Sequence, residues 1–369
     1  MSEWKTYKLG DVVDMRNGKK RPKEAGHFPV YGGNGILDYT NQYNAENVIV
    51  VGRVGAYCGS VYRCKQKCWV SDNAICVTAK PIIDNNFLFY LMSSLDFHHF
   101  HIGGAQPLMT QDIIGSFEIS LPPLEMQKRI ADILSAIDDK IELNRRINVN
   151  LEQQAQALFD EIMSCELEYD LIANIPHVIE TGKRPKGGVA SITSGIPSIG
   201  AENIKGLGYY DYSKTKYITE EFATTLKKGF VNGYELLIYK DGGKPGYFIP
   251  NFSIFGNGFP YNNMALNEHV FLLDFRNKGY NFFAYFYFQQ EKIMRYLNAQ
   301  GSKAAIPGIN RNDIENISIP TIQNKVIQDF CRQTENIITH ILNNASESRK
   351  LSIVRDALLP KLMSGEITV

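Results

Sequence analysis

The amino-acid sequence contains two copies of one domain-sized pattern. Gly18–Lys23 (GKKRPK) returns as Gly182–Lys186 (GKRPK), and Phe28–Ile36 (FPVYGGNGI) is echoed by Ile196–Ile204 (IPSIGAENI). Three more matches follow in the same order: Asn86–Leu91 with Asn281–Phe286, Ile119–Ile133 with Ile317–Phe330, and Ala157–Ser164 with Ala357–Ser364. The offset of roughly 165–200 residues is far longer than the roughly 20–50 residues of a solenoid unit, so the pattern predicts a duplicated domain.

Each copy divides into a part rich in glycine and aromatic residues and a helical tail. In the first part, short apolar runs lie between Gly, Asn and Asp residues, which is typical of strands and turns. A segment with helical spacing follows, so we expect α+β domains. The strands are expected at 47–52, 73–79, 235–240 and 269–275, and the helices at 86–100 and 281–297.

The two tails repeat apolar residues in steps of three and four, the pattern of a coiled-coil seam. Asn144 and Asn148 interrupt the first seam, which fixes its register, and Pro360 is expected to kink or end the second helix early. Two long seams in one chain predict an antiparallel coiled coil that separates two globular domains. The seam residues are Ile130, Leu134, Ile137, Ile141, Leu151, Leu158 and Ile162 in the first tail and Ile327, Phe330, Ile338, Ile341, Leu351, Val354, Leu358 and Leu362 in the second.

Charge and cysteine content exclude several classes of protein. Thirty-nine Lys and Arg residues balance thirty-nine Asp and Glu residues, so a nucleic-acid partner would have to bind local patches. Six cysteines in 369 residues are too few for a disulfide scaffold. No apolar stretch approaches the roughly 20 residues that span a bilayer, and the first residues lack an apolar signal region. We therefore expect a cytoplasmic protein with reduced thiols and no membrane partner.

Several segments of the chain carry distinctive motifs. They are Trp4–Val13 (WKTYKLGDVV), the central helix Leu121–Asn148, the C-terminal element Arg355–Ile367 (RDALLPKLMSGEI), and Asn267–Leu273 with its weaker partner Val70–Val77. Together they resemble the specificity (S) subunit of type I restriction–modification systems, and the last pair matches a strand of that family's target-recognition domains. The second half lacks the Trp-Lys-x-x-x-Leu-Gly signature of the first, and Tyr169–Pro176 stands in its place. The resemblance otherwise covers nearly the whole chain.

The resemblance implies a non-catalytic subunit that recognises a bipartite site on double-stranded DNA. Each target-recognition domain would read one half of the site. The helices would act as a spacer and as the docking surface for modification (methyltransferase) subunits, expected to number two, and through them for restriction subunits. We place the first target-recognition domain at 1–122, the central helix at 123–167, the second domain at 168–320 and the C-terminal helix at 321–369. Two alternatives stay open: the specificity subunit of a related system with a fused methylase–nuclease partner, and a coiled-coil scaffold that binds protein.

Basic residues recur at matching places in loops of both halves, where Lys and Arg are the usual partners of DNA phosphates. Loops before the two long helices and a hairpin-like segment at 53–57, with its match near Gly242, add further candidates. Short side chains there would let the backbone approach a groove, while polar groups reach phosphates or base edges. The candidate DNA-binding residues are Arg16, Lys19, Lys20, Arg21, Lys23, Arg53, Gln106, Lys183, Arg184, Lys186, Lys240, Lys244, Ser302, Lys303 and Arg311.

The sequence matches the signatures of metal sites, cofactor sites and catalytic sites only in part. Cys58, Cys64, Cys68 and Cys76 fall within nineteen residues, but only Cys64 and Cys68 have the short spacing of zinc ligands, which favours buried thiols. Ile254–Tyr261 matches only part of the glycine loop and Pro-Pro-aromatic motif of adenine methyltransferases, and there is no Gly-x4-Gly-Lys-Ser/Thr phosphate loop. We expect an isolated chain that is inert, with no metal and no cofactor.

Overall fold

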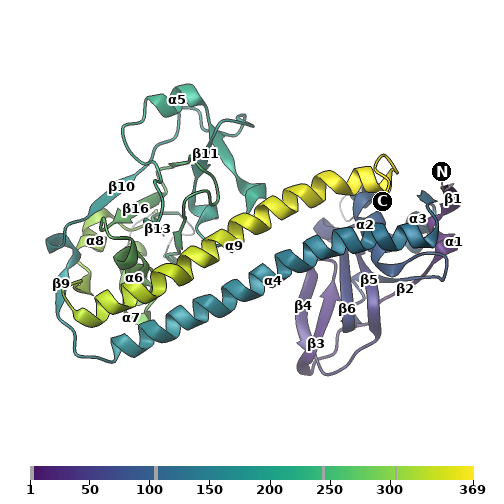
Figure 1. The fold of residues 1–369 in the computed structure, drawn as a ribbon, viewed down its shortest axis with the longest axis horizontal. Coiled ribbons are helices and arrows are strands. Elements are labelled where there is room, and N and C mark those ends of the chain that lie inside the picture. Colours follow the sequence, from purple (N-terminus) through teal and green to yellow (C-terminus); the bar gives the residue numbers. More distant parts are fainter. Residues whose placement is uncertain (1–3, 104–106, 243–245, 304–305) are drawn as a thin grey trace. The chain divides into compact units, whose positions relative to one another are not determined.

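The computed structural model describes residues 4–103, 107–242, 246–303 and 306–369 (Figure 1). The chain divides into two compact units, one made of Met1–Lys140 with Leu351–Val369 and the other of Ile141–Lys350. Helices α4 (Leu124–Met163) and α9 (Lys325–Met363) each contribute residues to both units. Within the described ranges, no helix is long and apolar enough to cross a membrane.

The first unit is built around a six-stranded sheet in the order β2-β7-β5-β6-β3-β4. Because successive side chains of a strand point to opposite faces, Ile49 and Val51 of β5 pack towards α2, while Val48 and Val50 pack with buried cysteines on the other face. The elements are β1 (Lys5–Lys8), α1 (Leu9–Val12), β2 (Val13–Asn17), β3 (Ala25–Gly32), β4 (Gly35–Thr40), β5 (Ala45–Gly52), the 3-10 helix η1 (Gly55–Tyr57), β6 (Val61–Val70), β7 (Ala74–Ala79), α2 (Asn85–Ser94), the 3-10 helix η2 (Phe97–His99), α3 (Gln111–Gly115) and β8 (Glu118–Leu121).

The second unit has a four-stranded sheet in the order β10-β16-β13-β14 and a smaller sheet in the order β12-β11-β15. Helix α6 packs against strands β13 and β14 of the four-stranded sheet and is buried along nearly its whole length. The elements are β9 (Tyr169–Leu171), η3 (Ile172–Asn174), β10 (Val178–Thr181), β11 (Ile196–Ile199), η4 (Ala201–Asn203), η5 (Tyr212–Lys214), β12 (Lys216–Ile218), α5 (Glu220–Thr224), β13 (Leu236–Tyr239), β14 (Phe252–Ile254), β15 (Ala265–Leu266), β16 (Val270–Asp274), α6 (Lys278–Phe288), α7 (Glu291–Gly301), α8 (Arg311–Glu315) and β17 (Ser318–Pro320).

The predicted duplication is visible in the strand topology. The order β2-β7-β5-β6 of the first unit corresponds to β10-β16-β13-β14 of the second. Strand β3 pairs in parallel with the end of β6, as β11 does with β15. The pair β1–β8 leads into α4, and β9–β17 leads into α9. The segment from Tyr169 therefore occupies the place of the N-terminal signature that the second half lacks, and the expected α+β fold class is confirmed.

Two of the predicted helices have different bounds in the structure. The helix expected at 86–100 begins one residue earlier, where the Asp84 side chain accepts the N–H groups of Asn86 and Phe87, and it ends at Ser94 because Leu95 is extended. The helix expected at 281–297 is divided into α6 and α7 because Gln290 is extended (ψ 140°). The division separates a helix that is buried on all sides from one that is buried on a single side.

Helices α4 and α9 pair in antiparallel fashion within each unit, as predicted. In the first unit the Arg355 guanidinium lies 2.8 Å from the Asp138 carboxylate. In the second unit Asn148 donates to the Ile341 carbonyl oxygen (3.0 Å) and accepts from the Asn344 amide (2.9 Å). Towards the N-terminus of α4, the buried Asn144 reaches residues further along α9, among them Ser348 (3.3 Å).

The predicted seam residues are buried to different degrees. Val354 lies outside the seam with 48% of its surface exposed, because the neighbouring Arg355 takes the inward position and pairs with Asp138. Helix α9 also continues to Met363, so the early end expected at Pro360 is wrong; a proline in the last turn removes only one amide donor. Ile130, Leu134, Ile327, Phe330, Ile338, Ile341 and Leu362 are buried, and Ile137, Ile141, Leu151, Leu158, Ile162, Leu351 and Leu358 are half-buried.

Candidate nucleic-acid interface

Three segments that the sequence singles out separately meet in the first unit. The Gly18 N–H donates to the Ala74 carbonyl (3.0 Å), and the Arg53 N–H donates to the Asn73 carbonyl (2.9 Å). The Met109 N–H in turn donates to the Arg53 carbonyl (2.8 Å). We call this group of loops the first corner; it comprises Gly18–Lys23, Arg53–Tyr57, Ser71–Ala74 and Pro107–Thr110.

The second unit repeats this arrangement. The Gly182 N–H donates to the Asn267 carbonyl (3.2 Å), the Lys240 N–H to the His269 carbonyl (2.9 Å) and the Ile309 N–H to the Lys240 carbonyl (2.8 Å). The structure thus brings the predicted segments together twice, with corresponding backbone hydrogen bonds. The second corner comprises Gly182–Gly188, Lys240–Gly242, Leu266–Val270 and Pro307–Asn310.

A glycine is required at the start of both basic loops. A Cβ atom on Gly18 would lie 2.0 Å from the Ser71 carbonyl oxygen, and one on Gly182 would lie 1.6 Å from that of Leu266. These oxygens belong to the turn before β7 and to the end of β15. A larger residue at either glycine would therefore push the basic loop away from the neighbouring main chain at the same place in both units. The glycines that open the repeated GKKRPK and GKRPK segments therefore serve close packing of backbone against backbone.

The first corner presents its cations mainly to solvent. Arg53 is half-buried, and its guanidinium donates to the Asp72 carbonyl oxygen (3.3 Å). Arg21 lies 3.7 Å from the exposed Asp38 carboxylate, a pairing that adds little stability at the surface. The exposed cations of this corner are Lys19, Lys20, Arg21 and Lys23.

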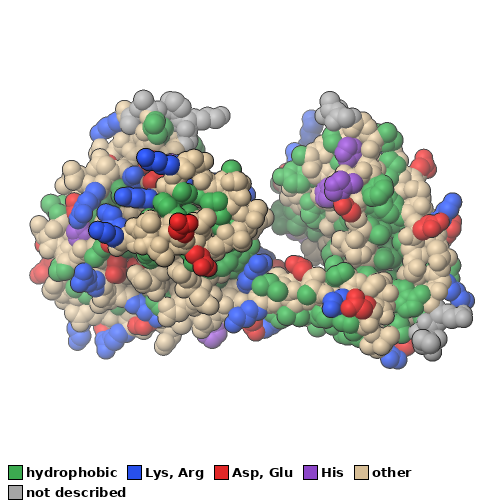
Figure 2. Space-filling view, turned by 90° about the horizontal axis from the view of Figure 1, so that it is seen from above, with side chains coloured by type: hydrophobic (Ala, Val, Ile, Leu, Met, Phe, Trp, Pro, Cys, Tyr) green, Lys and Arg blue, Asp and Glu red, His purple; other side chains and the backbone are tan. Residues whose placement is uncertain are grey.

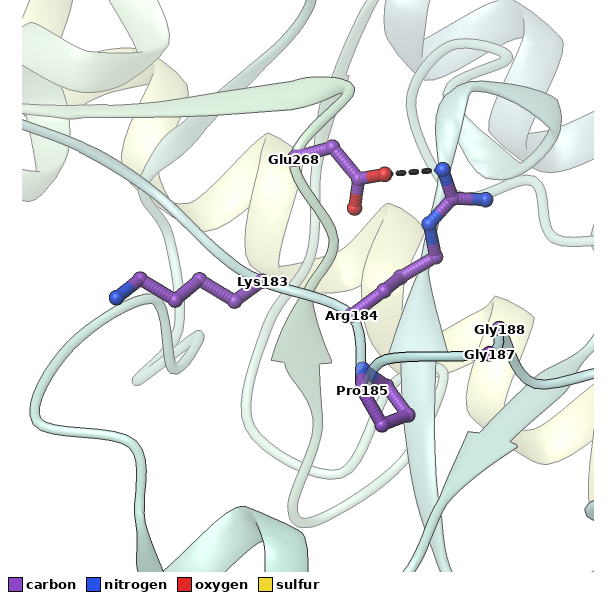
Figure 3. A pocket seen from close by; sticks show the side chains of 6 residues that line it. All are labelled: Lys183, Arg184, Pro185, Gly187, Gly188 and Glu268. Carbon is purple, nitrogen blue, oxygen red and sulfur yellow. Dashed lines mark ion pairs between the residues drawn. The ribbon is translucent and has the colours of Figure 1, made fainter.

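The second corner holds two of its cations in a network of acids. The Arg184 guanidinium pairs with the Glu268 carboxylate (Figure 3). It also lies 3.3 Å from Nε2 of His269. The ring of His269 pairs through Nδ1 with Asp241, whose other oxygen lies 3.2 Å from the Lys240 ammonium group. Arg184 is 57 positions from Asp241 and 85 positions from His269 in the sequence. The network of side chains fixes Arg184 and Lys240 in place.

The basic loop of the second corner also borders a cavity of about 670 Å³. The cavity is also lined by Phe222 of α5 and by the residues that follow this helix, among them the exposed Lys227 and Lys228. Figure 2 shows Lys and Arg side chains gathered on one face of this unit. These two lysines are not among the residues predicted from the sequence, because their only signal is the run LKKG, which has no counterpart in the first half. The cations that line the cavity are Lys183, Arg184, Lys186, Lys227 and Lys228.

Other predicted residues lie at the margin of the second corner. Ser302 and Lys303 directly follow α7, and Arg311 is the first residue of α8. The Arg311 guanidinium donates to the Glu315 carboxylate (2.7 Å), and His177 lies 3.2 Å from the same oxygen. The hydrogen bond from Arg311, with a smaller contribution from His177, lowers the pKa of Glu315. Arg311 is therefore already paired within its own helix.

One predicted residue has a different local structure from the one expected. Arg16 lies within β2 and not in a loop, because its main chain pairs with Cys76 of β7. Its guanidinium donates to the Asn44 carbonyl oxygen (2.5 Å). Gln106 and Lys244, which the sequence also proposes as DNA contacts, lie outside the described residues.

Three of the four clustered cysteines lie on the face of the six-stranded sheet opposite α2, whereas Cys58 packs in the core on the α2 side. Cys64, Cys68 and Cys76 are buried on that opposite face with Val48 and Val50. The hydrogen bond between Cys68 and Cys64 lowers the pKa of the Cys64 thiol to about 7. Among the described residues, no three His, Cys, Asp or Glu side chains are placed to hold a metal ion together.

Comparison with known proteins relates both sequence and fold to one family. Residues 1–153 match the family model of the Type I restriction modification DNA specificity domain. The HindI specificity subunit of Haemophilus influenzae is 24% identical over 379 residues, which cover 80% of this chain and 82% of that protein. The EcoprrI specificity subunit of Escherichia coli is 28% identical over 145 residues, which cover 37% of this chain and only 36% of that protein.

A solved structure extends the similarity to the whole fold. The type I restriction–modification S subunit from M. genitalium superposes with a TM-score of 0.62 at 16% identity, covering 98% of this chain and 96% of that one. Fold and sequence together define a DNA specificity protein of restriction–modification. More particularly, residues 1–153 match the DNA specificity domain of type I systems, and the chain is similar over most of its length to their specificity (S) subunits, which supports a non-catalytic role.

Proposed function

We propose that the chain recognises a bipartite site on double-stranded DNA, with each corner contacting one half of the site. The observation that carries this proposal is the repetition of one backbone arrangement in two units, each with a basic loop opened by a glycine that cannot be replaced. Exposed Lys and Arg side chains on such loops neutralise phosphates, while the paired Arg184 and Lys240 are positioned for more specific contacts. The DNA-binding assignments of the remaining candidate residues are part of the same proposal.

We further propose that α4 and α9 form the spacer between the half-sites and the docking surface for methyltransferase subunits. An α4 of 40 residues is roughly 60 Å long at 1.5 Å per residue. Large apolar side chains remain exposed on these helices, which marks a surface suited to a protein partner. They are Ile133, Leu143, Ile147 and Val149 on α4 and Ile353 and Val354 on α9. Restriction subunits would join through the methyltransferase subunits, and the assembled complex would work on DNA in the cytoplasm.

Methylome sequencing of cells that carry the chain with its methyltransferase subunits tests the bipartite site.

The spacer is tested by inserting four residues into both helices at the boundary of the two units, after Lys140 and after Lys350. These positions lie next to each other in the antiparallel register that Asp138–Arg355 and Asn144–Ser348 define. Four residues keep the helical phase approximately and add about 6 Å. At ~3.4 Å per base pair, the gap should grow by one or two base pairs while both half-sites stay the same.

The matched control inserts the same four residues after Lys140 alone. That variant shifts α4 against α9 by one turn and should lose recognition, because the register contacts on one side of the insertion no longer align. A modified site without two separated blocks would contradict the bipartite proposal. An unchanged gap in the double insertion would contradict the spacer alone. Binding that persists unchanged from low to high salt would instead favour a scaffold that binds protein.

A further inference from the structure

Each unit has an exposed tyrosine at a matching place, Tyr57 within the first corner and Tyr247 five residues after the Lys240–Gly242 segment of the second. Tyr57 lies in the loop that joins β5 to β6 and is 50% exposed; Tyr247 lies in the loop that joins β13 to β14 and is 61% exposed. These two loops correspond because β5–β6 and β13–β14 are equivalent antiparallel pairs in the two sheets. In both cases the next residue, Cys58 or Phe248, is buried. In each loop the buried residue anchors the main chain, and the side chain of the preceding tyrosine faces solvent.

Tyr57 is held against the first corner by its own short helix, η1. The Gly55 N–H at the start of η1 donates to the Pro107 carbonyl (3.1 Å), and the thiol of Cys58 donates to the Arg53 carbonyl oxygen (3.5 Å). The Tyr57 carbonyl accepts the N–H of Ser60 (3.1 Å), which closes the turn. The tyrosine is thus fixed within four residues of a predicted DNA-contacting arginine.

The loop of Tyr247 is held near the second corner by different contacts. The Asn298 side chain of α7 donates to the Phe248 carbonyl oxygen (2.5 Å), and the Phe248 ring stacks on Tyr239 at the end of β13. The last residue of α7, Gly301, accepts the Gly308 N–H (2.8 Å) and so connects this loop to the second corner. Within the described residues, neither the Tyr57 nor the Tyr247 hydroxyl has a hydrogen-bond partner, and neither ring packs on another ring.

We propose that Tyr57 and Tyr247 are specificity-determining residues, each of which contacts base edges of the DNA half-site that its own unit reads. This inference rests on the bipartite DNA-binding function proposed above. A phenol ring can pack on a thymine methyl group or a base edge, and its hydroxyl can donate or accept one hydrogen bond. Each tyrosine follows a predicted DNA-contacting cation along the chain, Arg53 before Tyr57 and Lys240 before Tyr247, and such cations attract the duplex backbone. Neither tyrosine is needed for the core, because both are exposed.

The symmetry of the pair argues for duplex DNA as the occupant of this surface. A pseudo-symmetric bipartite site places the same groove geometry before both corners, whereas an unrelated protein partner has no reason to present the same feature twice. Exposed apolar side chains also occur at the corners: Ile102 pairs with Leu108 of the first corner, and Ile306 directly precedes Pro307 of the second; both isoleucines are exposed. Exposed apolar side chains among cations fit a surface that contacts both bases and phosphates.

The test replaces Tyr57, Tyr247 or both by alanine in the complex with its methyltransferase subunits and reads the modified sites by methylome sequencing. Tyr57→Ala should relax the base preference in one half-site, and Tyr247→Ala should relax it in the other. Affinity for the original site should fall by about tenfold in each single variant, the order of one lost base contact. Tyr57→Phe and Tyr247→Phe keep the ring and should retain the preference at positions read by apolar contact.

Tyr169→Ala is the matched control, since Tyr169 is also exposed but lies in β9, where it pairs with β17 before α9. It should leave both half-sites unchanged. The inference is overturned if the alanine variants keep both half-sites intact, or if they weaken binding equally for every sequence. Failure of the proposed function is distinguishable, because the unmodified protein would then show no bipartite site. Thermal unfolding of each variant should stay at the value of the original chain, which separates a lost contact from a lost fold.

Discussion

The first and second corners use corresponding backbone hydrogen bonds but hold their cations differently. In the first corner, Arg53 meets only a backbone carbonyl and the lysines of the loop are exposed. In the second, Arg184 and Lys240 are paired with Glu268 and Asp241. A side chain that is positioned before binding loses less conformational entropy when it meets its target. Under the proposed function, the duplicated backbone would define where each unit contacts DNA, and the side chains of each copy would define which bases are read there.

The largest effect is expected from the glycines that the two corners share. Gly18→Ala and Gly182→Ala each place a Cβ atom within about 2 Å of a carbonyl oxygen, so the loop must separate from the sheet. We expect each to destabilise its unit by about 3 kcal/mol, at the upper end of overpacking effects, and to abolish recognition of one half-site. Denaturant unfolding and methylome sequencing measure the two consequences.

Gly33→Ala is the control for these substitutions, because its Cβ atom would find its nearest neighbour at an ordinary 3.4 Å. It should change stability by no more than a few tenths of a kcal/mol. Equal losses for Gly33→Ala and Gly18→Ala would show that close backbone packing is not what the first corner requires.

A smaller effect is expected from the lysines that only the second unit has. The double variant Lys227→Ala/Lys228→Ala should lower the slope of log K against log salt by roughly 1.8, since each lost phosphate contact removes ~0.9. Base preference should stay the same because phosphate contacts position the protein without reading sequence. Lys292→Ala/Lys325→Ala removes two exposed charges elsewhere in the unit and should leave the slope unchanged. An unaltered slope in the first variant would assign Lys227 and Lys228 to solvent.

The helix seams of the two units offer a further contrast, between an ion pair and an amide pair. Asp138→Asn weakens the contact to Arg355 and the hydrogen bond from Tyr90, and we expect a loss of about 1 kcal/mol that shrinks as salt is added. Asn148→Ala removes the hydrogen bonds to Ile341 and Asn344 and should cost a similar amount at every salt concentration. Urea unfolding at low and high salt measures both, and equal salt dependence would remove the distinction.

The smallest effect concerns the helices that follow the corners. In α8 the carboxylate of Glu315 is paired with Arg311, whereas the equivalent α3 begins with Gln111 and ends with Gly115. Because Arg311 and then His177 lower the pKa of Glu315, the folded-state pKa lies below the unfolded one, and the stabilisation is present above the unfolded pKa and lost as pH falls through the folded value. Glu315→Gln should remove this dependence, with a change below about 0.5 kcal/mol near pH 7. Thermal unfolding from pH 3 to 7 would detect it.

Periodicity made the duplication and the helix pair predictable. Repeated segments in one order require two similar folds, and steps of three and four require a helical seam, so neither conclusion depends on distant contacts. The ion pairs of the second corner were not predictable in this way. Arg184 meets Glu268 and His269 only because β15 and β16 bring them beside the loop after β10, and no local pattern in the sequence carries that information.

The same reasoning explains the errors in the helix pair and the omitted lysines. A heptad pattern assigned Val354 to the seam because it is apolar, yet Arg355 turns inward since Asp138 is there to receive it. Lys227 and Lys228 follow α5, a helix without a counterpart in the first unit, so the comparison of the two halves gave no signal for them. A sequence repeat predicts only the features that both copies share, so residues that occur in one copy alone give no such signal.

The position of Leu362 has a consequence for how the chain is made. This residue is buried in the core of the first unit together with Ile130 and Leu134, and Gly365 packs against the ring of Trp4. The ribosome therefore synthesises the whole of Ile141–Lys350 before the core of the first unit can be completed. At about 5–20 residues per second, the nascent first domain waits on the order of 10–40 seconds for its last helix. During that time its apolar surface is open to chaperones, and a chain truncated before the end of α9 would leave that surface exposed permanently.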